Sequence, residues 1–267
     1  MQLKRLAALK GSFYPDNCNK LKIYFQKFTD AIGSEFFSKP ISKIVPRAIL
    51  SPHAGYIYSG FTANVAYKVL SNSKAKRVVV IGPSHHHYFK GISGSYYESY
   101  ETPCTDLEID TAFLIELAKK HPIGFEPKAH LKEHSTEVQM PFISHYLPNT
   151  KVVELIYGDI DPKIVSNIIT TILEDRDNVV VISSDLSHFH TQQKAKELDK
   201  KCLQAISLLK IYELNNGCEA CGMIGIKAIL LTANELKLNS KLLDYRTSME
   251  YSGDDSSVVG YASAVFY

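Results

Sequence analysis

This 267-residue sequence lacks the features that mark several large protein classes. No stretch approaches about 18 uninterrupted apolar residues, and the N-terminal segment MQLKRLAALKGSFYP is basic without the apolar segment of a signal peptide. Lysine and arginine number 30 against 28 acidic residues, and a net charge of +2 provides no field that would attract nucleic acid or an anionic membrane. The sequence therefore predicts a cytoplasmic protein whose partner is a small-molecule substrate or a peptide.

The sequence also lacks a disulfide framework of the kind found in small secreted domains. Five cysteines are present, an odd number with uneven spacing, at positions 18, 104, 202, 218 and 221. Secreted domains of that kind use an even set of cysteines at regular spacings. The cysteine pattern therefore favours a reducing cellular interior.

No repeat, low-complexity tract or Pro/Gly/Ser linker divides the chain, which predicts one domain over residues 1–267. Short apolar runs rich in β-branched residues predict strands, at 48–50, 78–81, 152–156 and 179–182. Stretches with helical spacing alternate with them, at 61–70, 111–119, 164–173 and 195–209. Strands that are apolar on both faces predict an α/β fold with a mostly parallel or mixed central sheet flanked by helices.

Two further regions predict strands at the margins of the sheet. Residues 241–245 and 258–266 have little room for a helix between them, so we expect them to pair in antiparallel fashion at one edge. Residues 93–104, SGSYYESYETPC, are predicted to form another hairpin or edge element.

Histidines follow three of the predicted strands. The first strand ends in SPHAG with His53, the second in GPSHHH with His85, and the fourth in SSDLSH with His188. Because loops at the carboxyl ends of parallel strands meet in one crevice, these histidines are expected to converge. His121, His130 and His145 do not follow a strand in this way and are assigned no role.

Neutral imidazole is the commonest protein ligand for transition metals, and two imidazoles with one anionic group leave positions open for a substrate. Two anionic candidates are Asp185 and Cys221, the latter just before the helical run 223–236, where a helix N-terminus favours a thiolate. The segment EHSTEVQMPF at 133–142 adds polar residues, with Ser135 as an expected helix N-cap. The sequence does not decide which of Glu133, His134 and Glu137 line the site.

Six stretches together resemble the Memo-like family, known in bacteria and archaea as AmmeMemoRadiSam system protein B. They occur in the family's order: PHAGYIYSG at 52–60, GPSHH at 82–86, EHSTEVQMPF at 133–142, SSDLSH at 183–188, CG at 221–222 and SGDDSSVVGYAS at 252–263. The resemblance implies a fold similar to class III extradiol dioxygenases, which are non-haem iron enzymes.

The resemblance also implies roles for individual residues. His53, His85 and Cys221 occupy the positions of the family's metal ligands, and the implied cofactor is iron or copper, with zinc as a further candidate. Asp185 and His188 would lie beside the metal, His188 at the position of the dioxygenase acid/base. Where the family usually has a proline three residues after the CG step, this chain has Gly225. That difference brings the reach of Cys221 into question, with Cys218 as the alternative ligand.

Three functions are compatible with these residues. The first is a metal-dependent oxidoreductase with His53, His85 and Cys221 as ligands and His188 as proton carrier. The second is a metal-free cysteine enzyme with Cys221 as nucleophile, a histidine as base and Asp185 as the group that orients the base. The third is a non-catalytic module that binds a peptide or another ligand, partly through Tyr56 and Tyr58.

Overall fold

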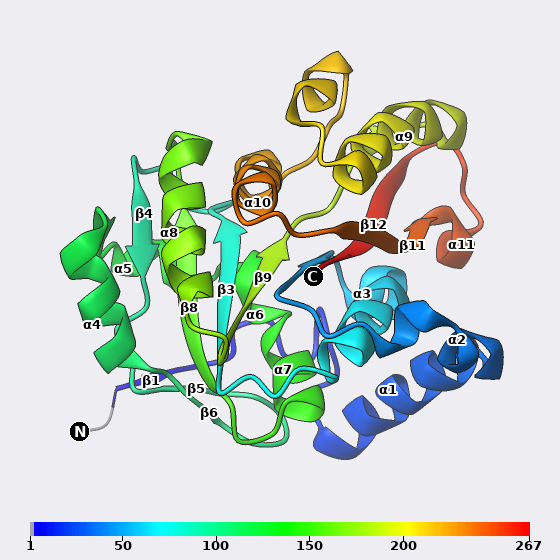
Figure 1. The fold of residues 1–267 in the computed structure, drawn as a ribbon. Coiled ribbons are helices and arrows are strands. Elements are labelled where there is room, and N and C mark those ends of the chain that lie inside the picture. Colours follow the sequence, from blue (N-terminus) through cyan, green and yellow to red (C-terminus); the bar gives the residue numbers. More distant parts are fainter. Residues whose placement is uncertain (1–2) are drawn as a thin grey trace.

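The computed structural model describes residues 3–267 and shows a mixed nine-stranded sheet with helices on both faces (Figure 1). Four neighbouring strands at its centre are parallel, in the spatial order β2 (Ala48–Ser51), β9 (Asn178–Ser183), β3 (Arg77–Pro83) and β8 (Lys151–Tyr157). These strands contain the four apolar runs of the sequence. The predicted fold class, α/β with a mixed sheet flanked by helices, is confirmed.

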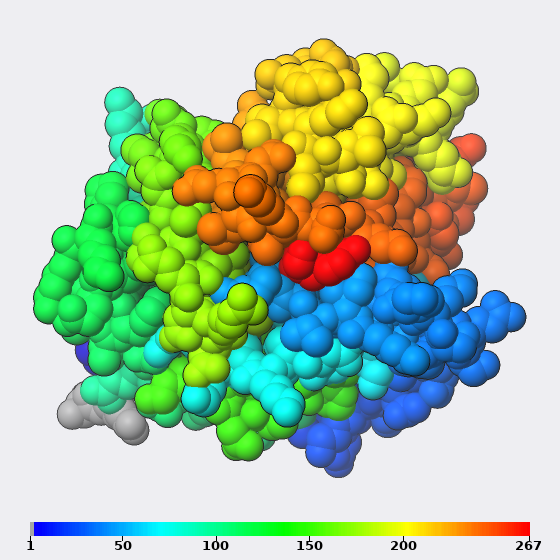
Figure 2. Space-filling model, viewed as in Figure 1, coloured from blue at the N-terminus to red at the C-terminus, as the bar shows by residue number. Residues whose placement is uncertain are grey.

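Antiparallel pairs extend this parallel centre on both sides. On one side β12 (Val258–Phe266) pairs with β2, and both β11 (Ser240–Thr247) and β10 (His188–His190) pair with β12. The expected antiparallel pairing of the C-terminal strands is thus confirmed. Because β12 lies against β2, the end of the chain packs beside its first third, as Figure 2 shows in red and blue.

The other side of the sheet corrects one prediction. There β4 (Ile92–Gly94) runs antiparallel to β8, and β7 (Ile123–Gly124) runs parallel to β4. A separate three-stranded sheet contains β1 (Lys4–Arg5), β5 (Ser99–Tyr100) and β6 (Leu107–Glu108). Residues 93–104 therefore do not form one hairpin, because β4 and β5 belong to different sheets. Of the predicted edge element, β4 lies one strand from the margin of the main sheet, and β5 pairs in antiparallel fashion with β6.

Several helices begin at a residue whose side chain caps the first turn. Asp110, Asp161 and Thr191 each accept a hydrogen bond from a free N–H in the first turn of the helix that follows. None of the helices in residues 3–267 has the length and apolar character needed to cross a membrane. The helices are α1 (Cys18–Ile32), α2 (Ser34–Ser38), α3 (Tyr56–Leu70), α4 (Thr111–Lys120), α5 (Pro127–His130), α6 (His134–Glu137), α7 (Met140–Tyr146), α8 (Pro162–Glu174), α9 (Gln192–Leu208), α10 (Met223–Glu235) and α11 (Met249–Ser252), with 3₁₀ helices η1 (Pro40–Lys43) and η2 (Ile211–Asn216).

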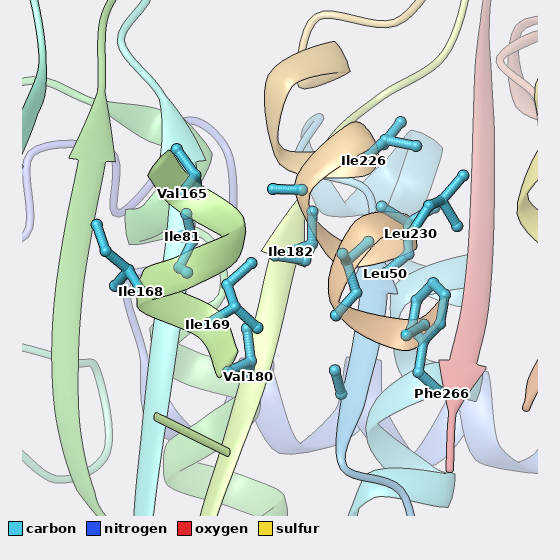
Figure 3. Close-up of a cluster of buried hydrophobic side chains, with 14 of the residues drawn as sticks. Leu50, Ile81, Val165, Ile168, Ile169, Val180, Ile182, Ile226, Leu230 and Phe266 are labelled. Atoms are coloured by element: carbon cyan, nitrogen blue, oxygen red, sulfur yellow. The ribbon is translucent and has the colours of Figure 1, made fainter. Parts of the chain in front are cut away.

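Alternate residues of the central strands face two separate hydrophobic layers. Leu50, Ile81 and Ile182 pack with residues of α8 and α10, as Figure 3 shows. Their neighbours Ile49 and Val80 point to the opposite face, against α3 and α7. Since successive side chains of a strand point to opposite faces, a sheet covered on both sides requires continuous apolar runs. This arrangement explains why these segments show no alternation of apolar and polar residues.

The cysteines form two disulfides, which were not predicted from the sequence. Cys18 is bonded to Cys104 and Cys202 to Cys218, with Cα–Cα distances of 4.7 Å and 4.9 Å. Disulfide pairing depends on proximity in space, and 86 residues separate the first pair in sequence, so the spacings did not reveal it. The odd cysteine is Cys221, which is free. The cysteine pattern therefore no longer supports a reducing interior.

Candidate metal centre

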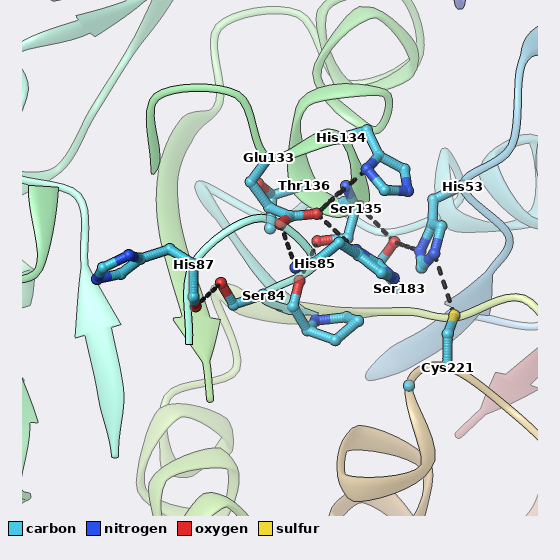
Figure 4. A network of polar contacts seen from close by, with 12 residues as sticks. His53, Ser84, His85, His87, Glu133, His134, Ser135, Thr136, Ser183 and Cys221 are labelled. Atoms are coloured by element: carbon cyan, nitrogen blue, oxygen red, sulfur yellow. Dashed lines mark hydrogen bonds and ion pairs between the residues drawn. The ribbon is translucent and has the colours of Figure 1, made fainter. Parts of the chain in front are cut away.

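Three loops bring two histidines and the free cysteine together at the carboxyl end of the sheet. His53 follows β2, His85 follows β3, and Cys221 lies two residues before α10. One ligand atom from each lies within 4.8 Å of the others, and His53 Nε2 is 3.1 Å from Cys221 Sγ (Figure 4). The expected convergence holds because β2 and β3 both neighbour β9, so that their loops leave the sheet side by side.

His53 is held by hydrogen bonds on two sides. Its Nδ1 lies 2.9 Å from the Ser183 hydroxyl, and its backbone N–H donates to the Asp185 carboxylate at 2.7 Å. Burial lowers the pKa of His53 well below 6.5, and the charge of His85 lowers it further. His53 is therefore a neutral imidazole at pH 7, the form that binds metals.

His85 is oriented by Glu133, which the sequence left undecided. The ring Nδ1 is 2.7 Å from Glu133 Oε1, and the backbone N–H donates to Oε2 at 2.6 Å. Burial opposes the charge on Glu133, but the hydrogen bonds from His85 outweigh it and hold the pKa of the carboxyl at about 2. A carboxylate on Nδ1 leaves Nε2 of His85 to a metal, an arrangement common around metal-binding histidines. The His85 side chain is 26% exposed, so the centre is accessible from solvent.

His134 also lies in this cluster. Its ring centroid is 4.3 Å from that of His85 and 5.3 Å from that of His53. Burial, with the charges of His53 and His85, lowers the pKa of His134 to about 3. His134 therefore lines the centre as a neutral group. Glu133, rather than Ser135, is the N-cap of α6, because its carboxylate accepts the Ser135 N–H.

The Cys221 thiol is packed against the loop after β9. The backbone N–H of Asp185 donates to Cys221 Sγ at 3.2 Å. At Gly222 a Cβ would lie 2.5 Å from Ser184 Cβ, so only glycine allows this approach. Burial, followed by the charge of Asp185, raises the pKa of the thiol to about 12. The sequence expectation of a dipole-favoured thiolate is therefore wrong for the metal-free protein, because burial outweighs the helix N-terminus.

Two questions about Cys221 are answered by its surroundings. Gly225 does not prevent the thiol from reaching His53, and its N–H donates to Tyr157 Oη at 3.2 Å, a bond that a proline could not form. Cys218 cannot replace Cys221 as a ligand here, because its sulfur is bonded to Cys202.

Asp185 organises the loops of the centre. Its Oδ1 accepts from the His53 N–H and its own N–H donates to Cys221, so one residue links two candidate ligands. Burial raises the pKa of Asp185 to about 6, against the opposing effects of the His53 hydrogen bond and the His188 charge. Within residues 3–267, the side-chain groups with metal-ligand spacing do not include Asp185.

His188 lies on β10 close enough to affect the pKa of both His53 and Asp185. A β-bulge follows it, since His188 and His190 pair with the adjacent residues Val259 and Val258. The extra residue, Phe189, is 78% exposed and has a left-handed φ of 61°. Bulges are over-represented beside functional sites, where they re-aim neighbouring side chains.

Replacing Phe189 by glycine is expected to stabilise the protein by about 0.5–1 kcal/mol, because an L side chain in the left-handed region is strained. The exposed ring forfeits little burial. Urea unfolding monitored by circular dichroism measures the change. Tyr88→Gly is the matched control: this side chain is 76% exposed and its φ is not positive, so its glycine variant should lose stability. If Phe189→Gly loses as much free energy of unfolding as Tyr88→Gly, the backbone at Phe189 is not strained.

Three residues named from the sequence, Glu137, Tyr56 and Tyr58, make their contacts with residues other than the candidate ligands. Glu137 binds the N-terminal segment, accepting from Arg5, the Ala8 and Leu9 N–H groups and Tyr14. Tyr56 is 2% exposed and its hydroxyl donates to the Val138 carbonyl, so it is unavailable to a ligand. Tyr58 is 40% exposed and packs edge-on against Tyr251.

Sequence reasoning missed a second buried constellation. Ser93 Oγ is 2.9 Å from His130 Nε2, and His130 Nδ1 is 2.8 Å from Glu154 Oε2. This order resembles a hydrolytic triad, yet all three residues are 0% exposed, so no substrate reaches them. A glutamate inside the apolar run VVELIY was the available signal, since a buried charge requires a partner.

Comparisons with known proteins cover nearly the whole chain. A family model described as Memo-like protein matches residues 5–265. Curated relatives named MEMO1 family protein occur in Saccharolobus solfataricus (32% identical over 282 residues, 99% of both chains) and Sulfurisphaera tokodaii (33% over 289 residues, 98% of this chain and 99% of the relative). The crystal structure of an uncharacterized protein from Escherichia coli K12 aligns with a TM-score of 0.51 at 11% identity, over 83% of this chain and 100% of that chain, a likeness in fold alone.

Proposed function

The chain belongs to the Memo-like family, and on that premise we propose that it is a metal-dependent oxidoreductase acting on a small substrate. Iron or copper is the proposed metal, with zinc as the third candidate. The family expected from the six sequence motifs is confirmed. A cytoplasmic location stays a prediction from sequence.

One observation carries the proposal: a ring nitrogen from each of His53 and His85 and the sulfur of Cys221 lie within 4.8 Å of one another. The Nδ1 atoms of His53 and His85 are already engaged by Ser183 and Glu133, so in both rings Nε2 is the nitrogen left for a ligand. Imidazole suits iron, copper and zinc alike, while a thiolate favours copper(I), zinc and iron in sulfur-rich settings. The donor set therefore fits the proposed metals better than magnesium or calcium.

The chain's own residues supply the rest of the proposed chemistry. A redox-active metal in this centre would provide electron transfer and positions open to a substrate. His188 would carry a proton to or from the substrate, since it lies at the margin of the centre and is partly exposed. Asp185 would hold the His53 and Cys221 loops at their spacing.

Metal analysis tests this proposal directly. Protein purified without added metal is expected to contain about one iron or copper ion per chain, measured by inductively coupled plasma mass spectrometry and by anomalous scattering from crystals. His53→Ala and Cys221→Ser should each lose the metal. His87→Ala is the matched control, because His87 belongs to the same histidine triplet but turns away toward Glu126 (Figure 4). Full occupancy in the His53 and Cys221 variants would refute the ligand set.

The metal-free cysteine enzyme has weaker support than the metal enzyme. Cys221 and His53 are close enough for a thiol–imidazole pair, but a thiol with a pKa raised to about 12 is a poor nucleophile at pH 7. Rapid alkylation of Cys221 in chelator-treated protein would restore this alternative. The non-catalytic binding module retains only Tyr58 of its two proposed tyrosines, because Tyr56 is buried.

A further inference from the structure

We propose that Ser183 and Gln139 act as positioning residues that fix the proton of His53 on Nδ1 and so keep its Nε2 lone pair free for the metal. The role in metal binding rests on the proposed function. The position of the proton is a property of the metal-free protein and can be measured without a metal. Neither residue lies among the candidate ligands, and both are fully buried behind His53.

The argument begins at a group that can only accept hydrogen bonds. The Pro52 carbonyl lies 2.9 Å from Gln139 Nε2, which fixes the amide with its NH₂ group on that side. The Tyr67 hydroxyl, 3.0 Å from Gln139 Oε1, donates to the other end of the amide. The second N–H of Gln139 therefore points to Ser183 Oγ, at 2.9 Å, and donates to it.

Ser183 has a single hydroxyl proton, which it donates in a short hydrogen bond to another group that can only accept, the Ser135 carbonyl. With its proton donated to Ser135 and one lone pair accepting from Gln139, the hydroxyl can only accept a further bond. His53 Nδ1, at 2.9 Å, must therefore carry the proton of that contact. Figure 4 shows Ser183 on one side of the His53 ring and Cys221 on the other.

This tautomer leaves Nε2 of His53 without a proton, 3.1 Å from Cys221 Sγ. The opposite tautomer would place a proton on Nε2, directed at the sulfur, and that proton would have to be displaced before a metal could bind. His85 is arranged in the same sense by Glu133, through a charge instead of a relay of neutral groups. Both histidines thus present the same ring nitrogen to the centre.

Nuclear magnetic resonance of the metal-free protein tests the inference without any metal. In protein labelled with ¹⁵N-histidine at pH 7.5, long-range ¹H–¹⁵N correlations separate the two tautomers, and His53→Ala assigns the signals. We expect wild-type His53 to be protonated on Nδ1. In Ser183→Ala the tautomer protonated on Nε2 should become populated, since that proton can bond to Cys221. Ser263→Ala is the matched control, a buried serine whose hydroxyl has no hydrogen-bond partner within residues 3–267.

Metal affinity provides the second readout. Ser183→Ala is expected to raise the dissociation constant for Zn²⁺ by about 10–100-fold, the usual effect of losing a group that orients a ligand, while Ser263→Ala leaves it unchanged. A wild-type His53 protonated on Nε2 would overturn the inference even if metal binds, and this outcome does not depend on the folding of the Ser183 variant. Ser183→Ala with the wild-type tautomer and affinity would overturn it equally. If wild type binds no metal, the proposed function fails, and the tautomer measurement still decides this inference.

Discussion

Replacing His130 by alanine is expected to destabilise the protein by about 3–5 kcal/mol, because it leaves the buried Glu154 carboxylate without its partner. His130 Nδ1 lies 2.8 Å from Glu154, and both side chains are 0% exposed. Burial opposes the charge on Glu154, yet the charge and hydrogen bond of His130, together with smaller effects of the Arg5 charge and the Thr136 hydrogen bond, lower the pKa of the carboxyl. The other contacts of Glu154, to Thr136 and Tyr100, are neutral hydroxyls.

Urea unfolding of two further variants separates this effect from a simple loss of packing. His121→Ala removes a histidine that is only half-buried and bonds to Thr171, so it should cost less than about 1 kcal/mol. Adding Glu154→Gln to His130→Ala removes the charge while keeping hydrogen-bonding atoms, and should recover at least about 1 kcal/mol. A His130 variant that loses no more than the His121 variant would show that the carboxylate does not depend on this histidine.

The parts of the fold that were predictable from sequence depend on local patterns. The apolar runs containing Ile49 and Val80 identified central strands. Because helices cover both faces of the sheet, consecutive residues of these strands are apolar, and this pattern is visible in the sequence. The helix after Asp161 was similarly predicted from its helical spacing over 164–173. That β4 and β5 belong to different sheets could not be predicted from local sequence. Strands that are far apart in sequence pair because the fold packs them together, and no local pattern shows this.

Long-range pairs account for most of what the sequence did not reveal. Cys18 meets Cys104, and Glu137 meets Arg5 across 132 residues, through the fold and not through spacing. His130 was assigned no role because it does not follow a predicted strand, and its partner Glu154, on another element, could not be identified from spacing. A charged or thiol side chain in a buried place signals that a partner exists, but it does not identify that partner.

The residues that meet in the candidate centre were predicted from the sequence, but the protonation state of Cys221 was not. The strand ends placed His53 and His85 at one edge on physical grounds. Cys221 and Asp185 were both anionic candidates, the family motifs favoured Cys221, and the structure brings Cys221 beside the two histidines. The protonation of the thiol could not be predicted, because a helix N-terminus is visible in sequence whereas burial by Ser184 and Asp185 is not. The sign of the Cys221 pKa shift therefore followed from packing.

Metal binding is expected to release about one proton per ion, and the affinity for Zn²⁺ should rise about tenfold per pH unit between pH 7 and 8.5. The thiol of Cys221, whose pKa is raised to about 12, is protonated throughout this range in the free protein and must lose its proton to become a ligand. His53 contributes nothing to the slope, because its pKa lies well below 6.5 and the ring is already neutral. The sign is fixed: the free state holds one more proton than the bound state, so raising the pH favours binding.

Isothermal titration calorimetry in buffers of different ionisation enthalpy counts the protons, and competition with a chelator of known affinity gives the slope. Cys221→Ser should lower proton release from about one to near zero and flatten the pH dependence, in addition to weakening binding. His87→Ala keeps the three candidate ligands and should behave as wild type. Tight binding by wild type with no proton released would mean that the sulfur is either already ionised or not a ligand, and the Cys221→Ser variant separates these outcomes, since only an ionised ligand loses affinity when it is replaced.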